Sequence, residues 1–397
     1  MSSSIPQPSV TEDTDIGASE AGIEMGVATA RPIPKANCLA SHGRFLSGLV
    51  TAMVTGLTWV GLTQIIKEAE LQHLLKSPAG LTYFCSGWLM LAFPPYLLMN
   101  VLVKHKNMKE VLRESIAVYA GIQGQEARHW PHVWKTALLL FTWALALYTY
   151  FEALWRIEAA DVTSLYATNH SFVYMLSWIV LFDKFVAIRI LAMIFSITGI
   201  VLFAYVDGFT GNTMWGVIIA VTSSSMTAVH KVLYSKFVGD ASVGQATLFL
   251  SCLGVLCLAF LWPILLAMYL TGAEVVDWER APWHQAVAAS LLLLVYQVLS
   301  VCVVHITWKE FIGIGVALSI PVCALVDGLW KSKKLSGMKL AAFALIGVGL
   351  LLILLPENWT DLVVKPFKAR KKHARRQSNA NSANHTLRSR LNRTTYM

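Results

Sequence analysis

Residues 245–270 read QATLFLSCLGVLCLAFLWPILLAMYL, and no charged side chain interrupts them. An α-helix rises about 1.5 Å per residue, so about 20 apolar residues cross the ~30 Å hydrocarbon core of a bilayer. This stretch is therefore long enough to span a membrane as a single helix. Similar apolar stretches recur along most of the chain.

The composition points to the same class of protein. Of the 397 residues, 56% are hydrophobic and 14% are charged. Soluble globular proteins carry about 25% charged residues, and the apolar stretches leave no room for a large soluble domain. These values exclude a soluble enzyme, a nucleic-acid-binding domain and a disordered scaffold. They predict an all-α polytopic membrane protein.

Ten apolar stretches each predict a transmembrane helix. They are residues 45–66, 82–103, 134–155, 162–182, 187–206, 213–236, 245–270, 285–306, 311–330 and 337–355. The preceding segment, 1–44, is poor in apolar residues and is predicted to be a disordered tail. The following segment, 356–397, is predicted to be a basic tail.

The charge distribution predicts the orientation. The formal net charge is +9, and between Lys365 and Met397 there are ten Lys/Arg and no Asp or Glu. Basic segments beside spans stay on the cytoplasmic side, and an even number of spans puts both termini on one side. Both termini are therefore predicted to be cytoplasmic. Four lysines between 331 and 339 oppose this orientation, because it places them on the exterior side. We expect anionic lipid, and no nucleic acid, as the partner of the tail.

The chain divides into two predicted halves, 45–206 and 213–355, of five spans each. An odd number of spans per half requires that the halves insert with opposite orientation. The segment 168–185 and the segment 318–335 match weakly at a constant offset of 150 residues. Inverted repeats of this kind place a binding site at mid-membrane in secondary transporters. The expected fold is ten transmembrane helices in two inverted five-helix repeats.

Several short motifs lie within these spans. They are TWVGLTQ (58–64), DVT (161–163), FVYMLSWIV (172–180) with Asp183, SMTAVHKVL (225–233), ALSIPV (317–322) with Asp327, and LPENW (355–359). Together they resemble the drug/metabolite transporter superfamily and, within it, the F subgroup of solute carrier family 35. The resemblance covers roughly residues 45–360. It implies a secondary transporter with thiamine as the expected substrate.

Polar side chains within spans are the candidates for a binding site, because a charge at the centre of a membrane helix costs at least ~2.5–3.5 kcal/mol. In the fourth span, polar residues recur at spacings of three to four and share one face. The substrate-binding candidates are Trp59, Gln64, Tyr148, Tyr166, Asn169, His170, His230, Lys231, Gln297 and Ser319, and the coupling candidates are Asp183 and Lys231. The alternative is that these polar groups hold neighbouring helices together.

Lys231 introduces a conflict over the substrate. An ammonium facing the cavity would meet an anionic group or take part in proton coupling, whereas thiamine is a cation that would favour aromatic faces and a carboxylate. The alternative is that Lys231 snorkels to the cytoplasmic interface. Glu152 lies four residues from Arg156, the spacing of an ordinary ion pair within one helix.

The expected function is alternating-access transport of a small organic solute across the lipid bilayer. The alternatives are an exchanger of nucleotide sugars or other phosphorylated metabolites, and a non-transporting receptor or scaffold. We expect no enzyme, cofactor or metal site, because the sequence has no GxxxxGK[ST], HExxH, GxSxG triad or Cys/His ligand spacing. A homodimer, and the choice between plasma membrane and Golgi-type membranes, stay open.

Overall fold

The computed structural model describes residues 38–71, 77–121, 130–182, 187–206, 211–239, 241–274, 282–306, 310–330 and 337–353. The chain divides into two units, Met1–His42 and Gly43–Met397. Of the first unit only residues 38–42, the start of the first helix, are described, and the remaining helices belong to the second unit. The predicted tails 1–44, up to residue 37, and 356–397 lie outside the described residues.

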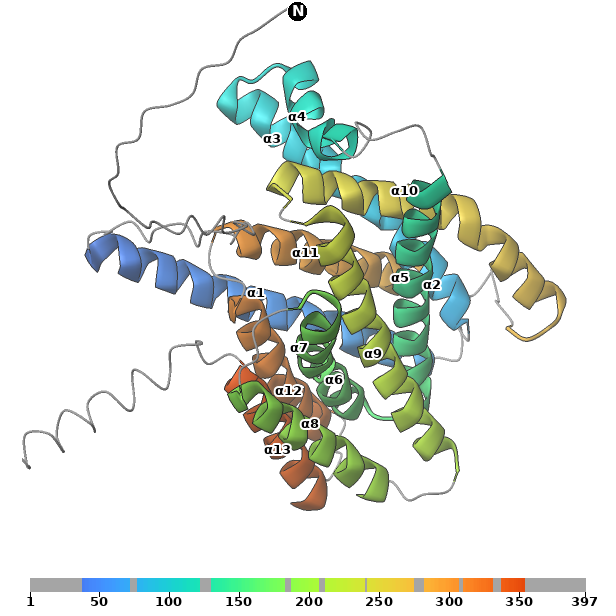
Figure 1. Ribbon diagram of the computed structural model, residues 1–397. Coiled ribbons are helices and arrows are strands. Elements are labelled where there is room, and N and C mark those ends of the chain that lie inside the picture. The colour runs from blue at the N-terminus through green and yellow to red at the C-terminus, as the bar shows by residue number, and fades with distance from the viewer. Residues whose placement is uncertain are drawn as a thin grey trace, which may run out of the picture. The chain divides into compact units, whose positions relative to one another are not determined.

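All regular structure in the described residues is helical (Figure 1). The helices are α1 (Cys38–Leu71), α2 (Pro78–Gly87), the 3₁₀ helix η1 (Trp88–Ala92), α3 (Phe93–Lys104), α4 (Met108–Gly121), α5 (Trp130–Arg156), α6 (Ala159–Ala167), α7 (Asn169–Val180), α8 (Ala187–Val206), α9 (Asn212–Val238), α10 (Val243–Leu270), α11 (Trp283–Ile306), α12 (Glu310–Trp330) and α13 (Gly337–Ile353).

Seven of the described helical segments are long and apolar enough to cross a membrane. They are 46–68, 78–104, 134–156, 188–206, 213–238, 243–270 and 283–302. Two shorter apolar segments, Gly313–Leu329 and Gly337–Ile353, lie in α12 and α13. Large apolar side chains face outward along these helices, as on α10, where Phe260 is 60% exposed. The chain is therefore a polytopic α-helical membrane protein, as the composition predicts.

Three predicted segments differ in detail from the structure. The span predicted at 82–103 is the run α2–η1–α3, which changes helix type just before Pro94 and Pro95. Prolines lack an amide hydrogen and are tolerated in the first turn of a helix, which is where α3 places them. The span predicted at 162–182 is two helices, α6 and α7, separated at Thr168. The connection predicted between 104 and 134 contains α4.

The helices pack in pairs that join distant parts of the chain. α8 lies along α13, α5 along α9, α6 against α12, and α10 against α2 and η1; Figure 1 shows α8 and α13 side by side. Glycine permits the closest approach. A Cβ on Gly349 would lie 2.7 Å from the carbonyl oxygen of Ala192, and one on Gly199 would lie 2.5 Å from Cγ1 of Ile346. The α8–α13 pair therefore depends on small residues, as membrane helix interfaces commonly do.

The α13 glycines give a matched test of this packing. Gly349→Ala should lower the melting temperature of the purified protein, because overfilling a packed site typically costs about 1–3 kcal/mol. Gly347→Ala should leave it equal or raise it, because a Cβ there meets nothing within 4 Å and alanine favours a helix over glycine by about 0.5–1 kcal/mol. Equal effects of the two substitutions would contradict the observed interface.

Candidate functional site

The central feature of the site is the break between α6 and α7. α6 is buried along its whole length, and Thr168 separates it from α7. Threonine and asparagine side chains compete with the backbone for hydrogen bonds, and both do so here. Thr168 Oγ1 donates to the carbonyl of Leu165 at 2.6 Å, and Asn169 Nδ2 donates to the carbonyl of Tyr166 at 2.6 Å. Thr168 keeps helical backbone angles and its N–H donates to the carbonyl of Leu165 at 3.3 Å, so these side chains supplement a locally altered backbone ladder.

Helix α9 supplies further polar groups to the break. Ser224 Oγ lies 2.9 Å from Thr168 Oγ1 and 3.4 Å from the carbonyl oxygen of Tyr166. Both hydroxyl-bearing residues are fully buried. Buried polar groups in a membrane must find protein partners, so Ser224 fixes the contact between α9 and the break.

Lys231 joins the same group from one face of α9. Its Nζ donates to Asn169 Oδ1 at 2.8 Å, and Asn169 in turn donates to the backbone of Tyr166. Within the described residues, no carboxylate lies at ion-pair distance from Lys231. The structure thus brings together three of the predicted residues, with the lysine charge held by a neutral amide.

The ring of Tyr166 belongs to a cluster of four buried aromatic side chains, which we call the aromatic cluster: Trp59, Tyr150, Tyr166 and Tyr296. Trp59 stacks on Tyr166 with ring centroids 4.6 Å apart and an interplanar angle of 16°. Its centroid lies 4.7 Å from that of Tyr296 and 5.0 Å from that of Tyr150. The cluster joins α1, α5, α6 and α11, and through Tyr166 it touches the Lys231–Asn169 pair.

The polar atoms of the aromatic cluster differ in whether they have a hydrogen-bond partner. The Tyr150 hydroxyl lies 2.7 Å from Thr63 Oγ1. The indole Nε1 of Trp59, on a side chain only 2% exposed, has no hydrogen-bond partner among the described residues. A buried donor without a partner costs free energy, and an acceptor on a bound solute would remove that cost. Trp59 is therefore the best-placed donor for a ligand in this cluster.

The two histidines predicted to line the site, His230 and His170, each contact a backbone carbonyl of a helix. His230 Nδ1 lies 3.2 Å from Thr142 Oγ1 and 3.2 Å from the carbonyl oxygen of Leu139, both on α5. Its ring lies 5.5 Å from that of Trp143. His170 Nδ1 contacts the carbonyl oxygen of Ala167 in the preceding turn at 3.3 Å.

A second polar group closes one end of the bundle; we call it the end cluster: Gln64, Asp161, Asp327 and Lys339. Asp327 accepts hydrogen bonds from Gln64 Nε2 and from the backbone N–H of Ala160, each at 2.9 Å. Lys339 Nζ pairs with Asp161 at 2.6 Å. The two aspartates are 4% and 2% exposed. The end cluster links α1 and α6 to α12 and α13.

Sequence reasoning selected only Gln64 from the end cluster. The same cost argument that singled out Lys231 applies to a carboxylate in an apolar helix, so it could have selected Asp327 as well. Asp161 and Lys339 lie at predicted helix ends, where charges are common, and gave no such signal.

The remaining predicted residues do not join either cluster. Tyr148 and Gln297 are half-buried and have no hydrogen bond to the other candidates in the described part of the chain. Ser319 is buried, and its hydroxyl donates to Val316 of its own helix at 2.6 Å. Asp183 lies outside the described residues. The expected ion pair between Glu152 and Arg156 is confirmed.

No protein-family model matches the sequence. Individual relatives do. Solute carrier family 35 member F3 of Mus musculus is 34% identical over 367 residues, which cover 90% of this chain and 85% of the relative. Solute carrier family 35 member F4 of Homo sapiens is 35% identical over 340 residues, 83% of this chain and 64% of the relative. The chain belongs to solute carrier family 35, in its F subgroup.

Two more distant likenesses accompany these relatives. An uncharacterized transporter of Schizosaccharomyces pombe is 21% identical over 79% of this chain and 97% of its own length. A solved crystal structure covers 77% of this chain at 16% identity and a TM-score of 0.47, which is too distant to place helices by. Family membership makes the chain a membrane transporter of small solutes, whose environment is the lipid bilayer; solute carriers are not enzymes.

Tyr150 and Trp59 give a matched pair for testing the aromatic cluster. Tyr150→Phe removes the hydroxyl that contacts Thr63 and should lower the melting temperature, since a hydrogen bond contributes about 0.5–1.5 kcal/mol. Trp59→Phe removes a donor that has no partner among the described residues, so its loss of stability should come only from the smaller ring. If the Trp59 variant bound substrate as tightly as the parent chain, its indole N–H would not be a ligand contact.

Proposed function

We propose that this chain is a secondary active transporter that moves a small organic solute by alternating access, with thiamine as the leading candidate. The observation that carries this is the break at Thr168, deep in the bundle. Discontinuous helices at membrane depth are tolerated where they line a solute pathway, and they form the binding sites of many secondary transporters. Here the break lies against the aromatic cluster and Lys231. Membership of solute carrier family 35 agrees with this function.

We propose that ten crossings form two inverted five-helix repeats, 45–206 and 213–355. A two-fold axis in the membrane plane relates segments of equal rank in the two halves and brings into contact those that lie beside the axis. Three such pairs are in contact: the second with the seventh (α2 and η1 with α10), the fourth with the ninth (α6 with α12), and the fifth with the tenth (α8 with α13). This pairing supports the repeat more directly than the weak sequence match does.

We propose that both termini lie in the cytoplasm and that the basic C-terminal tail contacts anionic lipid. In this orientation the end cluster lies on the non-cytoplasmic side. It joins α1 and α6 of the first repeat to α12 and α13 of the second. Alternating access requires the two repeats to separate at this end, so the end cluster acts as the gate on that side.

The gate can be tested with a native thiol. Cys323 is fully buried and accepts a hydrogen bond from Gln64 Nε2 at 3.3 Å, one turn from Asp327. Asp161→Asn removes the carboxylate charge that holds Lys339, and it should raise the rate at which a membrane-impermeant maleimide labels Cys323 by several-fold. Reversing both charges, Asp161→Lys with Lys339→Asp, should restore protection.

Cys257 provides the internal control, because it is equally buried and lies in α10, outside the gate. Its labelling should stay slow in all variants. If Cys323 were labelled as slowly in Asp161→Asn as in the parent chain, the end cluster would not be a gate.

The aromatic cluster suits a solute that carries an aromatic ring. Trp59 presents a flat, buried surface that already stacks on Tyr166, and a solute ring could replace that contact. Aromatic faces also attract a cationic ring through the quadrupole of the π-system. Both properties match thiamine, which supplies a cationic ring and hydrogen-bond acceptors for the Trp59 N–H.

Lys231 supports a second candidate, a phosphorylated solute such as a nucleotide sugar. Its ammonium is half-buried and has an amide, not a carboxylate, as its described partner. An ammonium of this kind binds phosphate as a point charge, and it would repel a cation. A nucleotide sugar would also supply an aromatic base for Trp59.

Uptake into liposomes separates these candidates. We expect purified protein to take up labelled thiamine saturably, with competition by unlabelled thiamine and not by a mixture of nucleotide sugars. Lys231→Gln should then leave thiamine affinity equal or improved. If a nucleotide sugar is the substrate, the same variant should lose about tenfold or more in affinity, or roughly 1.4 kcal/mol.

Lys236→Gln is the control for general charge effects, because Lys236 is exposed on the same helix. It should behave as the parent chain does with either substrate. Absence of thiamine uptake by protein that retains its melting temperature would remove the thiamine assignment and leave the fold intact.

A further inference from the structure

Helix α4 begins immediately after a membrane span ends. The apolar segment 78–104 ends at Lys104, and only three residues separate it from α4. His105 adopts a left-handed conformation with φ 49° and ends α3. The carbonyl of Asn107 then accepts the N–H of Glu110 at 2.9 Å and starts the new helix. If residues 78–104 cross the bilayer, α4 starts at its surface.

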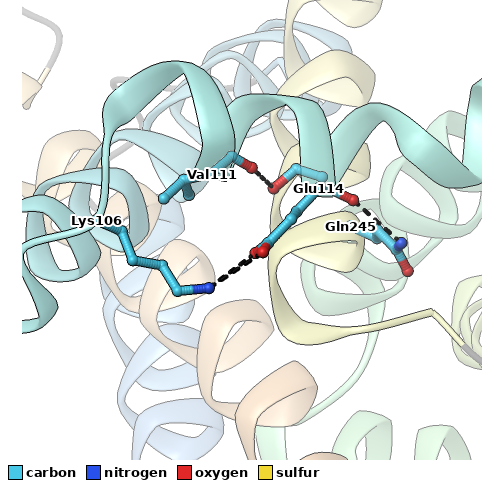
Figure 2. Close-up of polar contacts among 5 residues, drawn as sticks. Lys106, Val111, Glu114 and Gln245 are labelled. Atoms are coloured by element: carbon cyan, nitrogen blue, oxygen red, sulfur yellow. Dashed lines mark hydrogen bonds and ion pairs between the residues drawn. The ribbon is translucent and has the colours of Figure 1, made fainter.

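The rotational setting of α4 is fixed by contacts with α10. Val111 and Ser115 are each 2% exposed. A Cβ on Gly244 would lie 2.8 Å from Ser115 Oγ, so glycine at this position lets α10 approach α4 closely. Gln245 Nε2 donates to the backbone carbonyl of Glu114 at 3.3 Å (Figure 2). α4 is held against α10 on the side of Val111 and Ser115, and the side of the helix next to this contact is exposed.

The exposed side of α4 that adjoins Val111 and Ser115 is apolar, and Lys109 and Arg113 lie beyond it, farthest from α10. Met108, Leu112 and Ile116 are 61%, 39% and 43% exposed. Their spacing of four residues places them in one stripe along the helix. A stripe of this kind is unfavourable in water, and in a membrane protein it marks a surface for lipid or for another protein.

The charges beside this stripe are basic. Lys109 and Arg113 are exposed and follow Met108 and Leu112 around the helix. The acidic Glu114 lies on the other side and pairs with Lys106 at 3.1 Å, as Figure 2 shows. The hydrogen bond and the charge of Glu114 raise the pKa of Lys106, which means that the pair favours the charged form of the lysine. Lys109 and Arg113 form no ion pair within the described residues, and the exposed Glu110 lies on the far side of them from the stripe, so the charges that border the stripe are positive.

We propose that α4 is an interfacial helix whose stripe of Met108, Leu112 and Ile116 inserts among the lipids of the leaflet where α3 emerges, with Lys109 and Arg113 binding anionic headgroups. Two observations favour lipid over a protein partner. The stripe is continuous in sequence with outward apolar residues at the end of α3, where Leu102 and Val103 are 62% and 71% exposed. Its flanking charge complements an anionic leaflet. In the proposed orientation this leaflet is the cytoplasmic one.

The test places a fluorophore on each side of α4. Dansylalanine is introduced by codon suppression at Leu112 or at Glu110 in the full chain, which is reconstituted in vesicles of equal parts phosphatidylcholine and phosphatidylserine. Lipids brominated near the top of the acyl chain act as quenchers. We expect quenching at 112 to exceed that at 110 by roughly threefold or more. Equal quenching, or water-like emission at 112, would overturn the proposal.

A second copy of the chain covering the stripe gives a different result. The fluorophore at 112 would then be covered by protein and protected from quenching by brominated lipid. This protection would weaken as the protein is diluted into more lipid. This outcome would replace lipid by a homodimer and overturn the proposal. The measurement does not depend on transport, so its failure would leave the proposed function standing.

The charge component is tested by moving the bromine between lipids. At constant vesicle composition, brominated phosphatidylserine should quench the probe at 112 about twofold more than brominated phosphatidylcholine does, because the basic edge gathers anionic lipid. Replacing Lys109 and Arg113 by glutamine should abolish this difference, and Lys236→Gln should preserve it. An undiminished difference in the double variant would overturn the role of these two residues.

Discussion

The structure depends on one constraint, that a backbone carbonyl released inside a membrane must find a donor within the protein. At Thr168 the regular helical ladder is interrupted, and the carbonyls of Leu165 and Tyr166 accept the N–H of Thr168 together with hydrogen bonds from the side chains of Thr168, Asn169 and Ser224. Asn169 must hold its amide in one orientation to do this, which turns its oxygen toward Lys231. The position of the lysine charge is therefore a consequence of how the break is repaired.

The sequence is sufficient to predict the class of fold because that depends on length and hydrophobicity alone. Long apolar helices such as α10 coincide with predicted spans, and the polar periodicity of residues 163–170 identifies the segment that holds the break. The break itself could not be predicted, because Thr168 and Asn169 can bond back to a continuous helix as readily as interrupt one. Its stability depends on Ser224, which the fold brings from another helix.

The partnerships of the end cluster are beyond local sequence reasoning for a related reason. Asp327 meets Gln64 and Ala160, and Lys339 meets Asp161, across more than 150 residues of chain. The periodicity of polar residues within one helix carries no information about contacts between such distant parts of the chain. α4 was not predicted because a short helix with charged residues lacks the uniform hydrophobicity of a membrane span. Its apolar stripe at 108, 112 and 116 can be recognised in the sequence only once a helix is assumed.

The end cluster and the contacts at the break differ in which hydrogen bonds and ion pairs can separate without disturbing the rest of the bundle. In the end cluster a buried carboxylate such as Asp161 has an ammonium as its partner, so separating α6 from α13 exposes both charges to water that can solvate them. At the break, Lys231 donates to the side-chain amide of Asn169, and that amide in turn donates to the backbone carbonyl of Tyr166. Moving Lys231 toward a solute would therefore leave Asn169 in place and the break intact. Under the proposed mechanism, the end cluster separates with both charges solvated, while the hydrogen bonds of Thr168 and Asn169 at the end of α6 stay in place.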